Sequence, residues 1–173
     1  MISLEYIAGI FDGEGCIHIN LRRIKRFSPR HSLKVTIGFF DKVGLLSELQ
    51  RMFGGGTLTL IKRKGNRRDI LVLIFQAKKA FEFLEIVRPY LKLKQTQAQL
   101  ALLLKETYSP SHRWKCLPKE LLIKREVIRR MLHQLNGGSN SSSFKELDLS
   151  LYGIKEEDVV KVRNAVEWRF KDE

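Results

Sequence analysis

One order of secondary-structure elements occurs twice in the first half of this chain: a helix followed by two strands. In the first two strand segments apolar and polar residues alternate, which is typical of strands with one buried face, whereas the fourth segment, residues 70–75, is apolar on both faces. A duplicated α-β-β unit of this kind predicts an α+β fold, with helices on one face of a single antiparallel four-stranded sheet. The predicted helices cover residues 4–11, 42–53 and 77–87, and the predicted strands cover residues 17–22, 32–39, 57–62 and 70–75.

The second face of the predicted sheet is polar and suits contact with nucleic acid. In the first strand, Ile17 and Ile19 alternate with His18 and Asn20. A twisted ribbon of two or four strands fits the DNA major groove, where Arg, Lys, Asn and Gln read base edges. For His18 two interpretations stay open, contact with a base or a hydrogen bond to its neighbours. The polar face is predicted to contain His18, Asn20, Arg22, Lys34, Thr36, Thr57, Thr59 and Lys62.

Positive charge is concentrated in the region of the predicted strands. Residues 16–75 contain 13 lysines and arginines but only three acids, so they hold +10 of the chain's net charge of +13. A basic loop at residues 23–30 and a hairpin tip at residues 63–68 contribute much of this charge. Such a distribution indicates a protein that binds a phosphate backbone. The alternative is a solvated charged face of the kind found in heat-stable proteins, although such faces usually mix both signs.

The N-terminal helix presents unusually small residues on one of its faces. Ser3 is a candidate N-cap for the predicted helix over residues 4–11. A spacing of four residues stacks side chains on one side of a helix, and small side chains there let another backbone approach closely. We therefore expect a second helix to pack against this one. The stacked pairs are Ala8 with Asp12 and Gly9 with Gly13.

Two acids, Asp12 and Glu14, follow at the C-terminal end of this helix. The helix dipole places partial negative charge there, which disfavours each carboxylate by roughly 0.3 to 1 kcal/mol. We therefore expect a positive partner near these acids. The candidates are lysine or arginine side chains, or a divalent cation of the Mg²⁺ type, which takes one or two carboxylates together with phosphate and water oxygens.

Residues 6–15, with the sequence YIAGIFDGEG, resemble the signature of the LAGLIDADG homing endonucleases. Residues 89–95, PYLKLKQ, resemble a second signature of the single-motif members of that family. The likeness covers roughly residues 4–107 and implies the saddle-like sheet of the LAGLIDADG homing endonuclease fold. A single motif per chain implies a homodimer whose motif helices pack at the two-fold axis. The interface residues implied in this way are Ala8, Gly9, Asp12 and Gly13.

The resemblance also implies roles for individual residues. Glu14 falls on the second acid of the motif, which binds the catalytic divalent ion, and the backbone carbonyl of Gly13 is the matching additional ligand. Asp12 matches the residue that caps and braces the paired helices. Lys94 matches a lysine that lies near the scissile phosphate, with a solvated lysine as the alternative. Asp41 falls where the family often has a polar residue in a water network, although it is equally well placed as an N-cap for the following helix.

The activity implied by the resemblance is intron homing by site-specific cleavage of double-stranded DNA. The target is expected to be long and pseudo-palindromic, and the products to carry short 3′ overhangs. Mg²⁺ is the expected cofactor, with Mn²⁺ as a substitute and Ca²⁺ occupying the site without supporting cleavage. Intron RNA maturases and non-cleaving DNA-binding regulators share the fold and stay open as alternatives. The residues assigned to DNA contact are His18, Asn20, Arg22, Arg23, Lys25, Arg26, Arg30, Lys34, Thr36, Thr57, Thr59, Lys62, Lys64, Arg67 and Arg68.

The remainder of the chain predicts an extension of this domain and a short appendage. We expect the endonuclease domain to cover residues 1–136, a flexible linker to cover residues 137–143, and a helical appendage to cover residues 144–173. Further helices are predicted over residues 96–108, 118–135 and 155–170. The last of these has an apolar stripe that either docks on the core or embraces flanking DNA. The stripe consists of Val159, Val162, Val166 and Phe170.

No segment of the sequence predicts export or a membrane. No apolar run approaches the roughly 20 residues of a membrane span, and the N-terminus lacks the basic region and cleavage site of a secretory signal. The chain has only two cysteines, Cys16 and Cys116, and no zinc-ligand spacing. We therefore expect an intracellular protein in the cytoplasm, the nucleoid or an organelle.

Overall fold

The structure is a computed structural model that describes residues 2–22, 28–65, 67–108, 117–137 and 147–168. The chain forms two compact units. The first consists of Met1–His18 and Ser32–Ala98, and the second consists of Ile19–His31 and Gln99–Glu173. Among the helices in these described ranges, none has the length and apolar character needed to cross a membrane.

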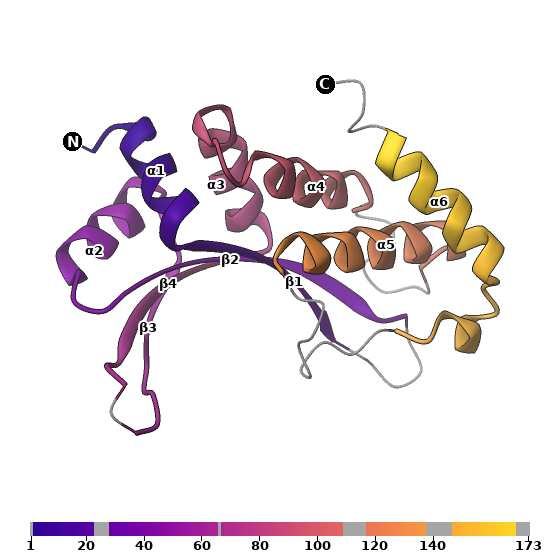
Figure 1. Cartoon of the computed structure of the whole chain (residues 1–173), viewed down its shortest axis with the longest axis horizontal. Coiled ribbons are helices and arrows are strands. Elements are labelled where there is room, and N and C mark those ends of the chain that lie inside the picture. The colour runs from indigo at the N-terminus through magenta and orange to yellow at the C-terminus, as the bar shows by residue number, and fades with distance from the viewer. Residues whose placement is uncertain (1, 23–27, 66, 109–116, 138–146, 169–173) are drawn as a thin grey trace. The chain divides into compact units, whose positions relative to one another are not determined.

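The first unit contains the predicted repeat of helix, strand and strand (Figure 1). The sheet has the strand order β1-β2-β4-β3, and β4 pairs antiparallel with both β2 and β3. This confirms the α+β class and the antiparallel four-stranded sheet predicted from the sequence. The elements are α1 (Leu4–Glu14), β1 (Gly15–Arg22), β2 (Arg30–Phe39), α2 (Val43–Met52), β3 (Thr57–Ile61), β4 (Ile70–Gln76) and α3 (Lys78–Val87), where β1 and β2 run on into the second unit.

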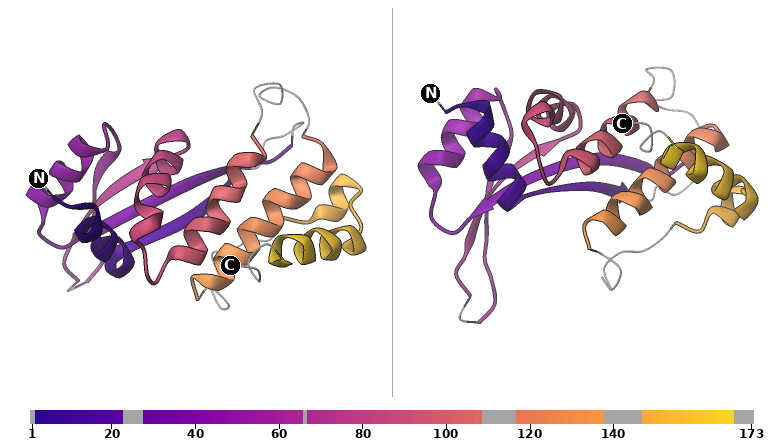
Figure 2. Two further views of the ribbon diagram at one scale, coloured as in Figure 1. Left: turned by 90° about the horizontal axis from the view of Figure 1, so that it is seen from above. Right: turned by 45° about the horizontal axis from the view of Figure 1, so that its top comes forward.

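The helices of the first unit lie on one face of its sheet (Figure 2). Four phenylalanine rings pack together between them and the sheet. Phe83 of α3 packs against Phe11 of α1, Phe53 after α2 and Phe75 of β4, with centroid separations of 5.1, 4.8 and 5.0 Å. Phe11, Phe75 and Phe83 are fully buried. Burial of large rings in such contacts is a main source of stability. The alternating strand pattern therefore identified the core face correctly, with Leu33, Val35 and Ile37 of β2 also buried.

The ends of the first two helices show which capping predictions were correct. Ser3 accepts a hydrogen bond from the backbone N–H of Tyr6 at 3.2 Å, which confirms it as the N-cap of α1. Asp41 is not the N-cap of α2, because the helix begins one residue later than predicted and Lys42 takes that position without a side-chain hydrogen bond. Gly54 ends α2 as predicted, with φ of 59° and a pair of hydrogen bonds typical of a Schellman motif.

The second unit is built from helices, and its C-terminal segment packs on α5. A short 3₁₀ helix, η1 (Arg88–Tyr90), and α4 (Gln95–Glu106) lead into this unit, followed by α5 (Lys119–Leu135), η3 (Leu149–Tyr152) and α6 (Glu156–Trp168). α6 contacts α5, with Val159 and Val166 buried and Val162 half-buried. The apolar stripe therefore docks within the protein, although Phe170 lies outside the described residues.

The boundaries of the two units differ from the domains predicted along the chain. α5 belongs to the same compact unit as α6, whereas the linker predicted at residues 137–143 separates the two helices into different domains. The α5–α6 contact accounts for this grouping. Gly137 is described, with φ of 73°, and the remainder of the expected linker lies outside the described residues. The division into an endonuclease domain over 1–136, a linker and an appendage stays a prediction.

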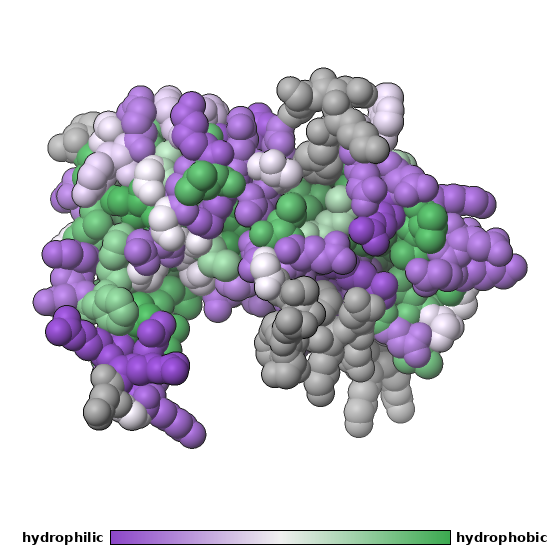
Figure 3. Space-filling model, viewed as in Figure 1, coloured by the Kyte–Doolittle hydropathy of each residue, from purple (hydrophilic) through white to green (hydrophobic). Residues whose placement is uncertain are grey.

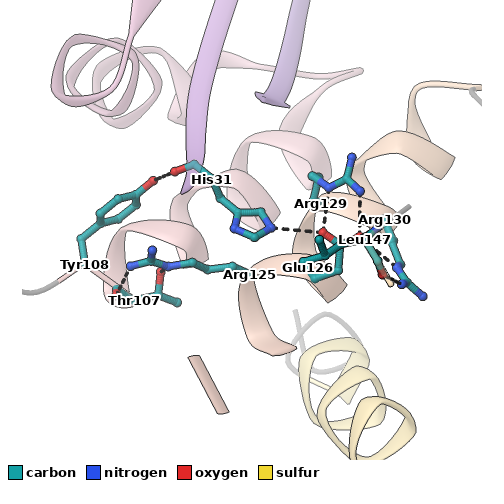
Figure 4. A network of polar contacts seen from close by, with 8 residues as sticks. All are labelled: His31, Thr107, Tyr108, Arg125, Glu126, Arg129, Arg130 and Leu147. Carbon is teal, nitrogen blue, oxygen red and sulfur yellow. Dashed lines mark hydrogen bonds and ion pairs between the residues drawn. The ribbon is translucent and has the colours of Figure 1, made fainter. Parts of the chain in front are cut away.

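A buried cluster of charged residues joins the segments of the second unit (Figure 4). Glu126 of α5, which is fully buried, accepts hydrogen bonds from His31 Nε2 at 3.1 Å, from two nitrogens of Arg129 at 2.8 and 2.7 Å, and from the backbone N–H of Leu147 at 3.2 Å. Arg130 contacts the same carboxylate and also donates to the carbonyl of Leu147 at 2.9 Å. Glu126 therefore ties the segment before η3 to the start of β2.

Arg125 occupies a second, neighbouring part of this cluster. Its Nε donates to the hydroxyl of Thr107 at 2.8 Å and its Nη2 to the carbonyl of Thr107 at 2.6 Å. The guanidinium lies over the ring of Tyr108, 4.5 Å from the centroid, and the Tyr108 hydroxyl donates to the carbonyl of His31. These contacts satisfy the groups at the end of α4, where the last carbonyls of a helix need partners.

Candidate functional site

The C-terminal turn of α1 carries Asp12, whose carboxylate binds the segment just before α4. Asp12 Oδ2 accepts hydrogen bonds from the backbone N–H groups of Lys92 at 2.7 Å and Leu93 at 3.1 Å, and Oδ1 accepts one from Lys94 N–H at 2.9 Å. The side chain of Lys94 in turn donates to the backbone carbonyl of Asp12. The two sequence signatures, about 80 residues apart, therefore meet at this carboxylate.

The electrostatics of Asp12 follow from these contacts. Burial opposes ionisation and by itself would raise the pKa of Asp12, but the three backbone N–H donors and the positive charge of Lys94 outweigh it and leave the pKa below its usual value. We expected a cation to offset the unfavourable helix dipole at this end of α1. For Asp12 the neutral backbone donors at the N-terminus of α4 carry most of that role, because a helix N-terminus favours an anion.

Glu14, the last residue of α1, has a different environment. Its side chain is exposed, and among the described residues it has no hydrogen-bond or ion-pair partner. Gly13 beside it is also exposed. The last carbonyls of a helix have no partner within the helix, so the Gly13 carbonyl is available to an outside group. The pair offers one carboxylate and one carbonyl oxygen, both of which are hard ligands that suit a cation of the Mg²⁺ type.

The described residues of one chain do not form a complete metal cage. No group of three or more His, Cys, Asp or Glu side chains within the described ranges could hold a metal ion. Mg²⁺ commonly keeps several waters and uses one or two carboxylates with substrate phosphates, so a single exposed carboxylate fits that mode of binding. The residues present therefore fit a divalent cation that shares its ligands with a bound substrate.

Asp41 has no described contact with this arrangement. It is exposed in the turn between β2 and α2. In the described part of the chain, no hydrogen bond or ion pair joins it to Glu14 or Lys94. Its role in a catalytic water network stays a prediction.

The four residues of α1 that were predicted at a dimer interface differ in their exposure. Ala8 is fully buried and Asp12 is 9% exposed, so both face the chain's own core. Gly9 and Gly13 are exposed, and a Cβ atom built at either would meet no other atom within 4 Å. Of these four described residues, the two glycines are therefore the ones open to close approach by a second copy, with Tyr6 exposed on the same side. The interface stays a prediction, and Gly9 and Gly13 are its exposed members.

Most of the described residues predicted on the polar face of the sheet are exposed. Lys34 and Thr36 are half-buried, and the basic β3–β4 hairpin forms a strongly hydrophilic projection (Figure 3). Asp69 Oδ1 accepts from the backbone N–H of Arg63 at 3.0 Å, which fixes the base of this hairpin. Arg23, Lys25 and Arg26 lie outside the described residues. The exposed residues of the prediction are His18, Asn20, Arg22, Arg30, Thr57, Thr59, Lys62, Lys64, Arg67 and Arg68.

Comparison with known proteins identifies the family to which this arrangement belongs. Residues 7–105, more than half of the chain, match the family model described as LAGLIDADG endonuclease. The chain belongs to the LAGLIDADG endonuclease family. The matched region contains residues 7–15 of the first signature, the whole of the second signature and all four strands of the sheet.

The relatives agree with this assignment. The DNA endonuclease I-CreI of Chlamydomonas reinhardtii is 28% identical over 99 residues, which cover 57% of this chain and 60% of that protein, less than two thirds of its length. Among solved structures, I-CvuI in complex with the I-CreI target has a TM-score of 0.65 at 18% identity, with 95% of this chain and 94% of that chain covered. The archaeal intron-encoded I-Vdi141I complexed with DNA has a TM-score of 0.64 at 13% identity, with 95% and 96% covered. These likenesses show that the LAGLIDADG fold is shared.

Sequence reasoning missed Gln76 as a residue of the polar face. It is exposed at the end of β4 and lies directly opposite Lys34 of β2. The predicted strand stopped at Phe75, although alternation from the buried Phe75 already placed the next side chain on the other face. Within the LAGLIDADG fold, this amide therefore joins Lys34 as a candidate for contact with a base edge.

Proposed function

We infer that this chain is a site-specific double-strand DNA endonuclease that acts as a homodimer with a divalent cation. The observation that carries the proposal is the contrast between the two motif acids. Asp12 is held by three backbone donors, whereas Glu14, two residues later, is exposed and unpartnered in the described part of the chain. The helix dipole disfavours a free carboxylate at this end by roughly 0.3 to 1 kcal/mol, and a bound cation would offset this, which supports a chemical role for Glu14.

In the proposed mechanism, Glu14 and the Gly13 carbonyl would hold the cation, for which Mg²⁺ is the expected physiological choice. When bound, the ion supplies charge stabilisation and water activation for attack on a phosphodiester. Lys94, held against the end of α1 by its bond to the Asp12 carbonyl, supplies positive charge beside this position. Mn²⁺ is expected to support cleavage, and Ca²⁺ is expected to bind without supporting it.

Dimerisation is supported by the glycine face of α1. With Gly9 and Gly13 exposed, two copies of α1 can approach at a two-fold axis with backbones in close contact. Such packing brings two Glu14 side chains to the middle of the assembly, one for each DNA strand. The target would then be long and pseudo-palindromic, and cleavage would leave short 3′ overhangs.

DNA as the substrate is supported by the charge of the sheet surface. The exposed polar strand residues and the basic hairpin lie in the region that holds most of the net positive charge. The relatives I-CvuI and I-Vdi141I were determined in complex with DNA. Arginine and lysine side chains on the hairpin would contact phosphates, and the strand side chains would contact bases in the major groove.

The test compares the wild-type protein with Glu14→Gln, using a plasmid library that contains randomised sites. The wild type is expected to give discrete linear products in Mg²⁺ and none in EDTA. Glu14→Gln is expected to bind DNA with unchanged affinity but to cut at least 100-fold more slowly, on the order of the loss typical for a key electrostatic group. Glu5→Gln, which changes an exposed acid in the first turn of the same helix, serves as the matched control.

The outcomes separate the alternatives. If the Glu14→Gln variant cleaves DNA in Mg²⁺ as fast as the wild type, the assignment of Glu14 as a metal ligand is refuted. A gel shift of the wild-type protein without any cleavage would favour a DNA-binding regulator, and preferential retention of structured intron RNA would favour a maturase.

A further inference from the structure

The open face of β4, one of the two central strands, is unusually apolar for a surface assigned to DNA. Leu73 and Phe75 point to the helices and are fully buried, so Val72, Ile74 and Gln76 point to the opposite face. Ile74 is half-buried there, in the middle of the strand. The register of β4 with β2 and β3 shows which residues lie beside Ile74.

Two cross-strand rows on this face differ in chemistry. The first, here the methyl row, consists of Thr36, Ile74 and Thr57, since Ile74 is the register partner of Thr36 on β2 and of Thr57 on β3. The second, here the amide row, pairs Lys34 with Gln76. The amide row carries side-chain N–H donors, whereas the methyl row presents methyl groups and only two hydroxyls.

The next row along β4 offers little additional contact. It contains Gly38, Val72 and Thr59, and Val72 is only 7% exposed. A Cβ atom at Gly38 would lie 3.3 Å from Val72 Cγ2 and 3.2 Å from Ile70 Cγ2, so these aliphatic side chains already fill the space beside the glycine. The methyl row therefore lies beside a part of the face that aliphatic side chains already fill.

We propose that the methyl row reads the C5-methyl group of thymine in the target. This inference rests on the proposed function, because it names a base preference of the same DNA-binding face. Thymine is the DNA base that presents a methyl group in the major groove, and apolar groups such as the threonine methyl recognise it by contact. Isoleucine has no polar atom in its side chain, so Ile74 cannot read a base by a hydrogen bond.

The burial of Ile74 against DNA gives the contact its driving force. Covering a methyl group removes apolar surface from water, and each covered methyl changes an equilibrium constant roughly fourfold. A base without the methyl group would leave a gap at the methyl row. The Lys34 and Gln76 side chains would at the same time bind purine edges nearby, since lysine suits guanine and glutamine suits adenine.

The experiment uses the full chain and two duplex libraries that differ only in the thymine methyl group. One library is made with thymine, and the other with deoxyuracil in every thymine position. Binding is selected in Ca²⁺ and the affinities of the recovered sequence are then measured in both forms. We expect thymine at a fixed position of each half-site, and roughly fourfold weaker binding for each contacted methyl group that is removed.

The variant Thr36→Ser/Thr57→Ser removes two methyl groups and keeps both hydroxyls. It is expected to lose part of its preference for thymine over deoxyuracil DNA, because the Ile74 contact remains, and urea unfolding of the variant shows that it is folded. Thr96→Ser, at an exposed position in the first turn of α4, is the matched control and should keep the full preference.

Each other result overturns the inference. Equal affinity for thymine and deoxyuracil DNA, a selected half-site without a fixed thymine, or an unchanged preference in the double variant would refute methyl readout by this row. These failures leave the proposed endonuclease intact if the protein still binds and cuts a selected site. Failure to bind any DNA would refute both.

Discussion

Replacing Glu126 by glutamine tests the buried charge cluster of the second unit. The Glu126 carboxylate is fully buried and accepts hydrogen bonds from His31, Arg129, Arg130 and the backbone N–H of Leu147. Glutamine keeps one oxygen but presents an NH₂ group where the other oxygen accepted hydrogen bonds. Two donors would then face each other in a buried site, and the surrounding positive charges would lose their counter-charge. Removing one partner of such a buried group costs about 3 to 5 kcal/mol.

The pH dependence of this effect can be worked out from the pKa of Glu126. Burial opposes ionisation, but the bonds from His31 and Arg129 and from the Leu147 backbone outweigh it and lower the pKa from 4.5 to about 2. Because the folded pKa lies below the unfolded value, the ionised group stabilises the protein above pH 4.5, and this contribution is lost as the pH falls towards 2. At 1.36 kcal/mol for each pKa unit, the contribution is about 3 kcal/mol.

The assay is urea unfolding followed by circular dichroism at several pH values between 7 and 3. The difference in unfolding free energy between wild type and Glu126→Gln should be largest at pH 7 and should shrink as the pH falls below 4.5. The control is Glu167→Gln, which removes an exposed carboxylate bonded to Arg163 at 2.7 Å. That exposed pair should contribute less than about 1 kcal/mol. A Glu126→Gln protein within about 0.5 kcal/mol of wild type at pH 7, or a difference that does not depend on pH, would refute the reasoning.

Three further substitutions test the first unit. Asp12→Asn should lower the unfolding free energy by about 1 to 3 kcal/mol in urea titration. The reason is that the new amide places a donor against the N–H groups of residues 92–94. Unchanged stability would contradict this. Gly9→Leu should leave the monomer folded, since nothing lies within 4 Å of a Cβ there, but should convert the dimer to a monomer in sedimentation experiments. A dimer of wild-type affinity would argue against the glycine face. Gln76→Ala should weaken discrimination at one base pair of a selected site by about 1 to 3 kcal/mol, and an unaltered selected sequence would exclude a base contact by this amide.

The local features of the fold could be predicted because they depend on neighbours in sequence. The Ser3 cap, the end of α2 at Gly54 and the buried face of β2 each follow from residues within one or two turns. Even here the position of one residue mattered. Asp41 has the right chemistry for an N-cap, but α2 begins at Val43, so Asp41 falls one residue before the capping position.

The long-range polar contacts could not be read from the sequence. Glu126 lies in a segment rich in lysine and arginine, which resembles a solvated helix face, yet it is buried because His31, 95 residues earlier, and Leu147 close over it. The partners of Asp12 are also distant in sequence, since the N–H groups that donate to it belong to a segment about 80 residues later. Helical periodicity gives the direction of a side chain, whereas its partner depends on which distant segment packs there.

The two motif acids show how one short sequence can serve both structure and chemistry. Asp12 and Glu14 are two residues apart, so on a helix their side chains point in widely different directions. Asp12 faces inward and binds the N–H groups before α4, which also holds Lys94 against the end of α1. Glu14 faces outward, where its charge is not compensated by any described residue. An Asp12 variant would therefore lose activity because Lys94 is displaced, and its unfolding free energy would fall as well. Loss of activity in a Glu14 variant should occur at unchanged stability, and this difference separates the positioning acid from the metal-binding one.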